Sequence, residues 1–178
     1  MGFVEVLSSL SLEPSEPHTI VDLGSGGGVP AFVIADSFPH WNFLLVERKV
    51  KRAEFLKLAL EKADFGMNIE VFVGQAENAA RERKNEEKAD FVTARSFAAP
   101  PITAECGCRF LKKGGYLVVS EPPTASGRWP STGLGPLGLE PVDTKQPTFG
   151  TFQALELKTP PEQRYPRRSS AMRKNPLW

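Results

Sequence analysis

The stretch Ile20-Val21-Asp22-Leu23-Gly24-Ser25-Gly26-Gly27-Gly28-Val29-Pro30 joins a short apolar run to a run rich in glycine. An apolar run bounded by glycines is typical of a buried strand, and a helical pattern follows from position 31. Glycines at such a junction let the backbone turn sharply and approach a ligand closely, because a Cβ atom would collide. In open α/β sheets, ligands bind where a strand ends and a helix begins. The stretch therefore predicts both an α/β fold and the position of its binding site.

The spacing of the glycines distinguishes this loop from a dinucleotide-binding loop. The dinucleotide pattern G-x-G-x-x-G needs a third glycine at position 29, where this chain has Val29. The pattern here is D-x-G-x-G-x-G, and its residues are Asp22, Gly24, Ser25, Gly26 and Gly28. A carboxylate at the end of the strand repels a pyrophosphate. The loop therefore suits a ligand that carries an ammonium group and no phosphate.

A second acidic residue, Glu47, ends the next apolar run, 25 residues after Asp22. A carboxylate at that strand end accepts hydrogen bonds from both hydroxyls of a ribose. A glycine loop with one acid before it and another on the next strand fits an adenosine that carries an amino-acid arm, which is S-adenosylmethionine. Two other interpretations stay open: a structural turn with a surface glutamate, and a nucleotide site of another kind.

The rest of the chain continues the alternation of strands and helices. Apolar runs predict five parallel strands, at Thr19–Leu23, Phe43–Glu47, Ile69–Val73, Asp90–Ala94 and Tyr116–Ser120. Helical patterns predict four helices between them, at Ala31–Phe38, Val50–Ala63, Gln75–Arg83 and Ile102–Leu111, the last one stopped by residues 112–115. Two edge strands follow, at Leu139–Asp143 and Thr151–Leu157. We therefore expect a doubly wound, seven-stranded, mostly parallel sheet with helices on both faces, the class I S-adenosylmethionine-dependent methyltransferase fold.

The last third of the chain has a different composition. Ten of the sixteen prolines fall at or after Pro122, and residues 121–138 are predicted to form a loop. Residues 164–178 contain no acidic residue and five basic ones, which are Arg164, Arg167, Arg168, Arg173 and Lys174. Residues 1–163 contain the other 17 basic residues and all 21 acidic ones, a net charge of −4, whereas the whole chain has +1.

This uneven charge divides the chain into a methyltransferase domain, residues 1–163, and a basic C-terminal tail, residues 164–178. Arginines bind RNA phosphates, and Tyr165 and Trp178 offer rings on which bases stack. We therefore predict that the five basic residues of the tail bind RNA. A disordered basic tail is the alternative.

Composition excludes several other classes. No apolar run approaches the roughly 18 residues that cross a bilayer, and the start, Met1–Leu12, lacks the basic region of a signal peptide. The two cysteines, Cys106 and Cys108, cannot form a disulfide framework and offer at most two metal ligands. We therefore expect core or surface thiols, no metal site, and a cytoplasmic monomer that contacts no membrane.

Three segments together resemble the RsmG family, also called GidB: Asp22 to Pro30, Lys51-Arg52-Ala53-Glu54-Phe55-Leu56 and Thr93-Ala94-Arg95-Ser96-Phe97-Ala98. The ending Arg164-Tyr165-Pro166-Arg167-Arg168 with Lys174-Asn175-Pro176-Leu177 is similar to the family's basic C-terminal pattern. The resemblance covers about residues 5–178. It implies methylation of guanine N7 in the 530 loop of 16S ribosomal RNA, with S-adenosylmethionine as methyl donor and 16S rRNA or the small ribosomal subunit as partner. Family members usually carry further N-terminal helices, and a Lys-Gly pair where this chain has Ser120-Glu121, so we expect an N-terminally shortened member.

The resemblance and the strand ends together assign roles to further residues. Arg95 follows a strand at the cleft where donor and acceptor meet, so its guanidinium is our candidate catalytic and cofactor-binding group, holding the donor carboxylate or guanine O6. Ala76 and Glu77 match the place where methyltransferases receive the adenine edge, with the backbone of Ala76 as the candidate contact. A solvated helix residue is the alternative for Glu77. Phe97 is a candidate to stack on a flipped base, or else a core aromatic. Arg128 and Trp129 form an acceptor lid or a buried loop anchor.

Guanine N7 has a free lone pair, so its methylation needs positioning and exclusion of water rather than a general base. The chain has no Pro-Cys pair, and no Asn-Pro-Pro-Tyr/Phe motif follows its fourth predicted strand. Both absences agree with a ring-nitrogen target, or with any target that needs no special activation. Two rival functions stay open: a methyltransferase with a small-molecule acceptor, and a non-enzymatic methyltransferase-like protein that binds RNA or a ribosomal partner.

Overall fold

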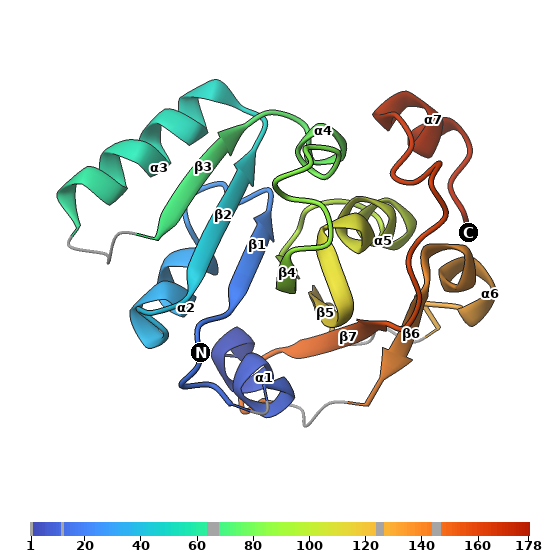
Figure 1. The fold of residues 1–178 in the computed structure, drawn as a ribbon, viewed down its shortest axis with the longest axis horizontal. Helices are drawn as coiled ribbons and strands as arrows, with labels where there is room; N and C mark the ends of the chain where they lie inside the picture. The colour runs from blue at the N-terminus through green and yellow to red at the C-terminus, as the bar shows by residue number, and fades with distance from the viewer. Residues whose placement is uncertain (1, 12, 64–67, 124–126, 144–146) are drawn as a thin grey trace.

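The sheet of the computed structural model has the strand order β3-β2-β1-β4-β5-β7-β6 (Figure 1). The structure describes residues 2–11, 13–63, 68–123, 127–143 and 147–178. The parallel strands are β1 (Thr19–Leu23), β2 (Asn42–Glu47), β3 (Ile69–Val73), β4 (Ala89–Ala94) and β5 (Leu111–Glu121). The strand β7 (Thr151–Leu157) lies antiparallel between β5 and β6 (Leu139–Val142). The predicted fold class is confirmed.

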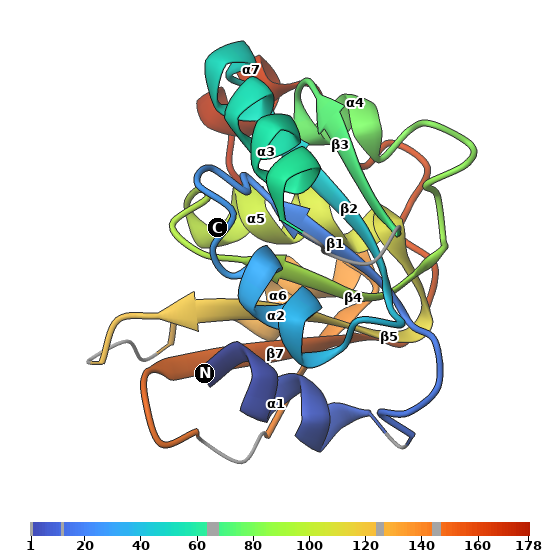
Figure 2. The same ribbon diagram turned by 90° about the vertical axis from the view of Figure 1, so that its left-hand side faces the viewer.

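Helices cover both faces of the sheet, as Figure 2 shows. One face packs against α1 (Gly2–Leu10), α2 (Ala31–Ser37) and α3 (Val50–Lys62), with Leu7, Ile34 and Trp41 in its core. The other packs against α4 (Ala76–Ala79), α5 (Pro100–Gly107), α6 (Ser131–Leu134) and α7 (Ser169–Lys174), with Phe110, Leu134 and Met172 in its core. Each strand therefore supplies apolar side chains to two cores, which explains why the strands read as nearly continuous apolar runs.

The helix predicted at Ile102–Leu111 begins and ends earlier. Pro100 and Pro101 start α5, because proline fits the first turn, where its missing N–H has no partner to lose. A 3-10 turn (Cys108–Phe110) follows, and the residues expected to stop the helix belong to β5. A Cβ at Gly115 would lie 2.9 Å from the carbonyl oxygens of Ala89 and Asp90. The glycines here therefore permit close packing of β5 on β4 rather than ending a helix.

Two other sequence predictions were also wrong in extent. The helix expected at Gln75–Arg83 is the single turn α4, followed by further turns. The loop expected at residues 121–138 contains α6 and a 3-10 turn (Gly135–Leu137), while its residues 124–126 lie outside the described residues.

Both ends of the chain form helices that the sequence patterns did not predict. The helix α1 buries Phe3, Val6 and Leu7 beside β5 and β7. The segment 164–178 contains α7, which lies near α4 (Figure 1). Its Tyr165 and Met172 are buried in the core on that face of the sheet. The C-terminal segment is therefore packed onto the domain.

Candidate functional site

Asp22 lies near the end of β1 with only 2% of its surface exposed. It is the register partner of Thr93 on β4, and the Thr93 hydroxyl donates a 2.7 Å hydrogen bond to Asp22 Oδ1. The other oxygen, Oδ2, is buried with no hydrogen-bond partner among the described residues. Burial raises the pKa of Asp22 from 3.8 to about 6, against the opposing effects of Thr93, Ser25 and the charge of Arg95. A buried acceptor without a donor fits a ligand that brings an N–H group.

The glycine loop is fixed to the end of β2 by backbone hydrogen bonds. The N–H groups of Gly24 and Ser25 both donate to the carbonyl of Val46, at 2.8 and 3.2 Å. Gly24 has φ +70°, and a Cβ there would lie 2.9 Å from the ring of Phe97. Both the turn and the ring contact therefore require glycine at position 24.

Glu47 connects the two strand ends. Its carboxylate is 3% exposed and accepts the N–H of Gly26 at Oε2 (3.0 Å) and the N–H of Lys49 at Oε1 (2.7 Å). A carboxylate oxygen accepts more than one hydrogen bond, so Glu47 retains capacity for two hydroxyl groups. The residue therefore both holds the glycine loop and presents acceptors to a ribose.

Two cavities border this loop. The first, about 230 Å³, is lined by Glu47, Arg52, Ala76, Ser96 and Phe97 among others. The second, about 450 Å³, runs along Gly24 to Gly27 and reaches Lys51, Arg52 and Arg95. The structure thus brings together the predicted residues Gly24, Ser25, Gly26, Glu47, Ala76 and Arg95 around adjoining cavities.

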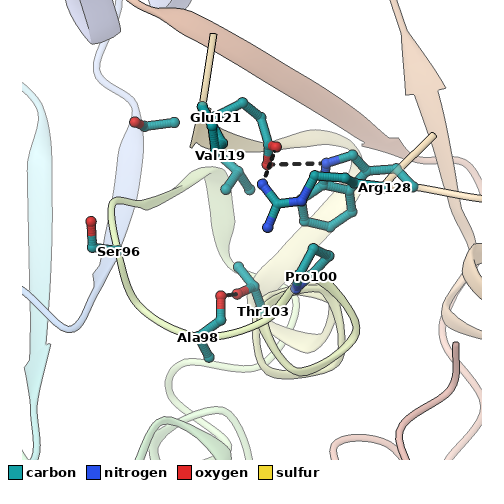
Figure 3. A pocket seen from close by; sticks show the side chains of 10 residues that line it. Ser96, Ala98, Pro100, Thr103, Val119, Glu121 and Arg128 are labelled. Carbon is teal, nitrogen blue, oxygen red and sulfur yellow. Dashed lines mark hydrogen bonds and ion pairs between the residues drawn. The ribbon is translucent and has the colours of Figure 1, made fainter. Parts of the chain in front are cut away.

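A third cavity, about 360 Å³, lies at the ends of β4 and β5 (Figure 3). Glu121, the last residue of β5, pairs there with Arg128, and its Oε1 accepts a 3.1 Å hydrogen bond from the Trp129 indole. Ser96 lines this cavity as well as the other two, and it has φ +53°, which is rare for a residue with a side chain. Ser96 is therefore the point where the three cavities meet.

Sequence reasoning missed Thr93 and Ser96 as site residues, although both lie in the Thr93–Ala98 segment that carried the resemblance. It also placed Glu77 at the adenine edge. Among the described residues, Ala76 lines the 230 Å³ cavity and Glu77 does not. The Glu77 carboxylate instead accepts the N–H of Ser169 at 3.1 Å, at the start of α7. The structure thus directs this side chain toward the C-terminal segment.

The five basic residues of the C-terminal segment lie in different surroundings. Arg167 pairs with the buried Glu105 of α5 through its backbone N–H, Nε and Nη2. Arg164 is exposed and pairs with Glu162 at 2.9 Å. Arg168, Arg173 and Lys174 are exposed on and beside α7. These three residues are therefore more accessible to solvent than Arg167 is.

The residues of the glycine loop, the α3 start and the β4 end also fall within one family model, "rRNA small subunit methyltransferase G" (GidB), which matches residues 3–122. The chain belongs to the GidB family. A relative named Ribosomal RNA small subunit methyltransferase G, from Deinococcus deserti, is 31% identical over 170 residues, which cover 90% of this chain and 69% of that protein. One from Thermotoga sp. (strain RQ2) is 37% identical over 121 residues, covering 68% of this chain and 51% of that protein. This GidB chain thus spans about half of the Thermotoga relative and 69% of the Deinococcus relative.

Solved structures share the fold of this GidB chain. A SAM-dependent methyltransferase from Aquifex aeolicus superposes with a TM-score of 0.62 at 15% identity, covering 85% of this chain and 87% of that chain. The antibiotic-resistance methyltransferase Kmr superposes with a TM-score of 0.60 at 17% identity, covering 85% and 91%. These similarities identify the class I methyltransferase fold.

The remaining features of this GidB chain concern metals, thiols and membranes. Cys106 and Cys108 are buried free thiols, and burial raises the pKa of Cys108 to about 12. No group of three or more potential metal ligands occurs among the described residues. Within the same described ranges, no helix has the length and apolar character to cross a bilayer.

Proposed function

We propose that this chain transfers a methyl group from S-adenosylmethionine to N7 of a guanine in the 530 loop of 16S rRNA. Two observations in a GidB-family chain carry the proposal: the buried Asp22 Oδ2 has no hydrogen-bond partner among the described residues, and the Glu47 carboxylate holds the glycine loop. A small-molecule acceptor and a non-enzymatic RNA-binding role are the alternatives that experiment must exclude. We further propose that the chain works as a monomer in the reducing cytoplasm, where its two thiols stay free.

Different residues bind the donor and position it for methyl transfer. Bound S-adenosylmethionine supplies a methyl group activated by its sulfonium. Asp22 Oδ2 accepts a hydrogen bond from the ammonium group, and Glu47 accepts the ribose hydroxyls. Ala76 borders the adenine, while Arg95 holds the donor carboxylate or guanine O6. The N7 lone pair is free, so the site needs alignment and exclusion of water more than acid–base chemistry.

The direct test of the function uses rRNA from a strain that lacks the corresponding methyltransferase. Incubation with the purified chain and S-adenosylmethionine should restore the N7-methylguanine signal of the 530 loop, read by primer extension after borohydride and aniline treatment. Naked 16S rRNA and intact small subunits are assayed separately. An unchanged signal with both substrates, despite donor binding, would favour a different acceptor.

We expect Glu47→Ala to weaken S-adenosylmethionine binding at least about tenfold, or 1.4 kcal/mol. The variant removes the ribose acceptor and releases the N–H groups of Gly26 and Lys49. Calorimetry measures the affinity. The matched control is Glu70→Gln, because Glu70 pairs with Lys84 on the surface. Equal affinities of Glu47→Ala and the wild type would show that Glu47 does not contact the donor.

Three exposed residues, Arg168, Arg173 and Lys174, should carry the RNA affinity of the C-terminal segment. Replacing all three with glutamine should make the slope of the log association constant for 16S rRNA against log salt concentration less steep by about 2–3 units. Each lost phosphate contact accounts for about one unit or slightly less. Filter binding of 16S rRNA over a salt series measures this slope. Replacing Lys57, Lys62 and Lys88 with glutamine is the control for charge alone. Equal slopes for the two triple variants would mean that α7 does not contact RNA.

Substitution is the right design here, because deletion of residues 164–178 would also remove core residues. Tyr165 and Met172 are buried, and Arg167 neutralises the buried Glu105. A truncated chain would lose RNA binding through unfolding as well as through lost charge.

A further inference from the structure

The 360 Å³ cavity at the ends of β4 and β5 adjoins both cavities of the proposed donor site. Ser96 borders all three, so a molecule in this cavity would lie next to the proposed donor site. Figure 3 shows Ser96 on one side of the cavity and the Glu121–Arg128 pair on another. Pro100, Pro122 and Trp129 add flat apolar surfaces to its wall. The cavity therefore has the position and the walls of a site for a planar ring.

Glu121 places a nearly buried carboxylate in this wall. Its side chain is 5% exposed, and the Arg128 guanidinium and the Trp129 indole hold its orientation. The C-terminal residue braces this arrangement, because the Trp178 indole donates a 2.9 Å hydrogen bond to the Arg128 carbonyl. Each carboxylate oxygen still has capacity for a further hydrogen bond. Glu121 is thus a fixed acceptor that faces a cavity large enough for a base.

We propose that this cavity receives the acceptor guanine and that Glu121 binds its Watson–Crick edge, an inference that rests on the proposed function. Guanine carries two adjacent donors on that edge, N1–H and the 2-amino group, which match the two oxygens of a carboxylate. Adenine has an acceptor at N1, which a carboxylate repels. Binding the Watson–Crick edge at Glu121 leaves N7, on the opposite edge, directed toward Ser96 and the donor.

The charge of Glu121 also favours the methyl transfer itself. The N7 lone pair forms the new N–C bond, the C–S bond of the donor breaks with its electrons remaining on sulfur, and no proton moves. The purine therefore gains one positive charge as the reaction proceeds. A carboxylate bound to its N1–H and 2-amino groups interacts more strongly with the transition state than with the neutral base.

The first experiment measures base preference with mononucleotides, followed by tryptophan fluorescence. Saturating S-adenosylhomocysteine occupies the donor site, so that nucleotides report on the acceptor cavity. Inosine monophosphate, which lacks the 2-amino group, should bind about fivefold to tenfold more weakly than guanosine monophosphate. Adenosine monophosphate should not saturate. Equal binding of guanosine and inosine monophosphates by the wild type would overturn the proposal without any variant.

The second experiment uses Glu121→Gln. This variant should remove the preference for guanosine over inosine monophosphate and lower kcat on 16S rRNA about a hundredfold, while its affinity for S-adenosylhomocysteine stays within about twofold. If Glu121 served only to anchor Arg128, Glu121→Gln would keep the preference for guanosine monophosphate. That result would refute the proposal. The matched control is Glu156→Gln, since Glu156 lies on β7 opposite Tyr116 in the middle of β5, pairs with Lys158 and does not line the cavity. This variant should behave as wild type.

The two experiments separate this inference from the proposed function. If wild-type enzyme methylates 16S rRNA but Glu121→Gln does so equally well, the function stands and the inference fails. If no rRNA is methylated but guanosine monophosphate binds in a Glu121-dependent way, the guanine site stands and the rRNA substrate is wrong.

Discussion

Asp22→Asn should unfold at a higher temperature than the wild type at pH 7 and should no longer bind S-adenosylmethionine measurably. Burial raises the pKa of Asp22 to about 6 in the folded chain, against 3.8 for an ordinary aspartate. The ionised carboxylate therefore costs the fold about 3 kcal/mol at pH 7. Asparagine keeps an oxygen for the Thr93 hydroxyl and removes the charge. The expected gain in melting temperature is up to roughly 10 °C.

The direction of the stability change follows from how the protonation of Asp22 depends on pH. Between pH 4 and 6 the folded chain binds a proton at Asp22 that the unfolded chain has released, so this group contributes less stability as pH rises through that window. Thermal melts of wild type and Asp22→Asn should therefore diverge from pH 4 to pH 7. Asp36→Asn is the control, because Asp36 is exposed on α2. A variant less stable than the wild type at pH 7 would contradict the argument.

The same charge underlies the proposed role of Asp22 in binding the ammonium group of the donor. A cationic group beside Oδ2 favours the ionised carboxylate, so donor binding near pH 6 should release part of a proton. Calorimetry at pH 6 in two buffers of different ionisation enthalpy detects this release. Asp22→Asn should give no binding heat in either buffer. Wild-type affinity in the variant would remove Asp22 from the donor site.

Arg167→Ala should lower the free energy of unfolding by about 3–5 kcal/mol, because the buried Glu105 carboxylate loses the guanidinium charge and both hydrogen bonds from it, and keeps only the backbone N–H of residue 167. Glu105 is 1% exposed and receives three hydrogen bonds from Arg167, at 2.7, 2.8 and 2.7 Å. The same interaction raises the pKa of Arg167 above its ordinary value. Arg109 adds to this attachment by donating to the Tyr165 carbonyl at 2.8 Å. Urea unfolding measures the loss.

A double variant separates the free-energy cost of an unpaired buried charge from the net contribution of the ion pair to stability. Glu105→Leu combined with Arg167→Met replaces both charges with apolar groups and should recover most of the stability lost in Arg167→Ala. Arg168→Ala, at the exposed neighbouring position, should change the free energy of unfolding by less than about 0.5 kcal/mol. A cost below about 1 kcal/mol for Arg167→Ala would mean that this ion pair does not hold the C-terminal segment.

Most of the sheet was predictable because its signals are local. The strands β1, β3 and β7 have the predicted limits, since apolar runs and glycines mark them directly. The helix end predicted at residues 112–115 was wrong, because basic residues before two glycines resemble a helix end. Gly115 is required instead by the approach of β4, a contact between strands that lies outside any local pattern. The helix α1 is short, and its burial depends on β5 and β7.

The candidate site likewise contains residues that the sequence predicts and residues that only the structure reveals. Asp22, Glu47 and the glycines follow from spacing along the chain, because strand ends of a parallel sheet meet at one edge. The hydrogen bond from Thr93 depends on the register of β1 and β4, and the role of Ser96 depends on its backbone angle. A count of basic residues cannot separate Arg167, which is paired with Glu105, from Arg168, which is exposed.

The meeting of three cavities at Ser96 has a consequence for how such enzymes diverge. The two cavities of the proposed donor site are lined by the glycine loop, β2 and α4, whereas the proposed acceptor cavity is lined by the end of β5 and residues 128–129. A lineage can therefore acquire a new acceptor by changing the second set while the first stays intact. Position 96 is the exception, because every substitution there alters both sides at once. Its backbone angle further restricts the choice to residues that tolerate φ of +53°, chiefly glycine, asparagine and aspartate.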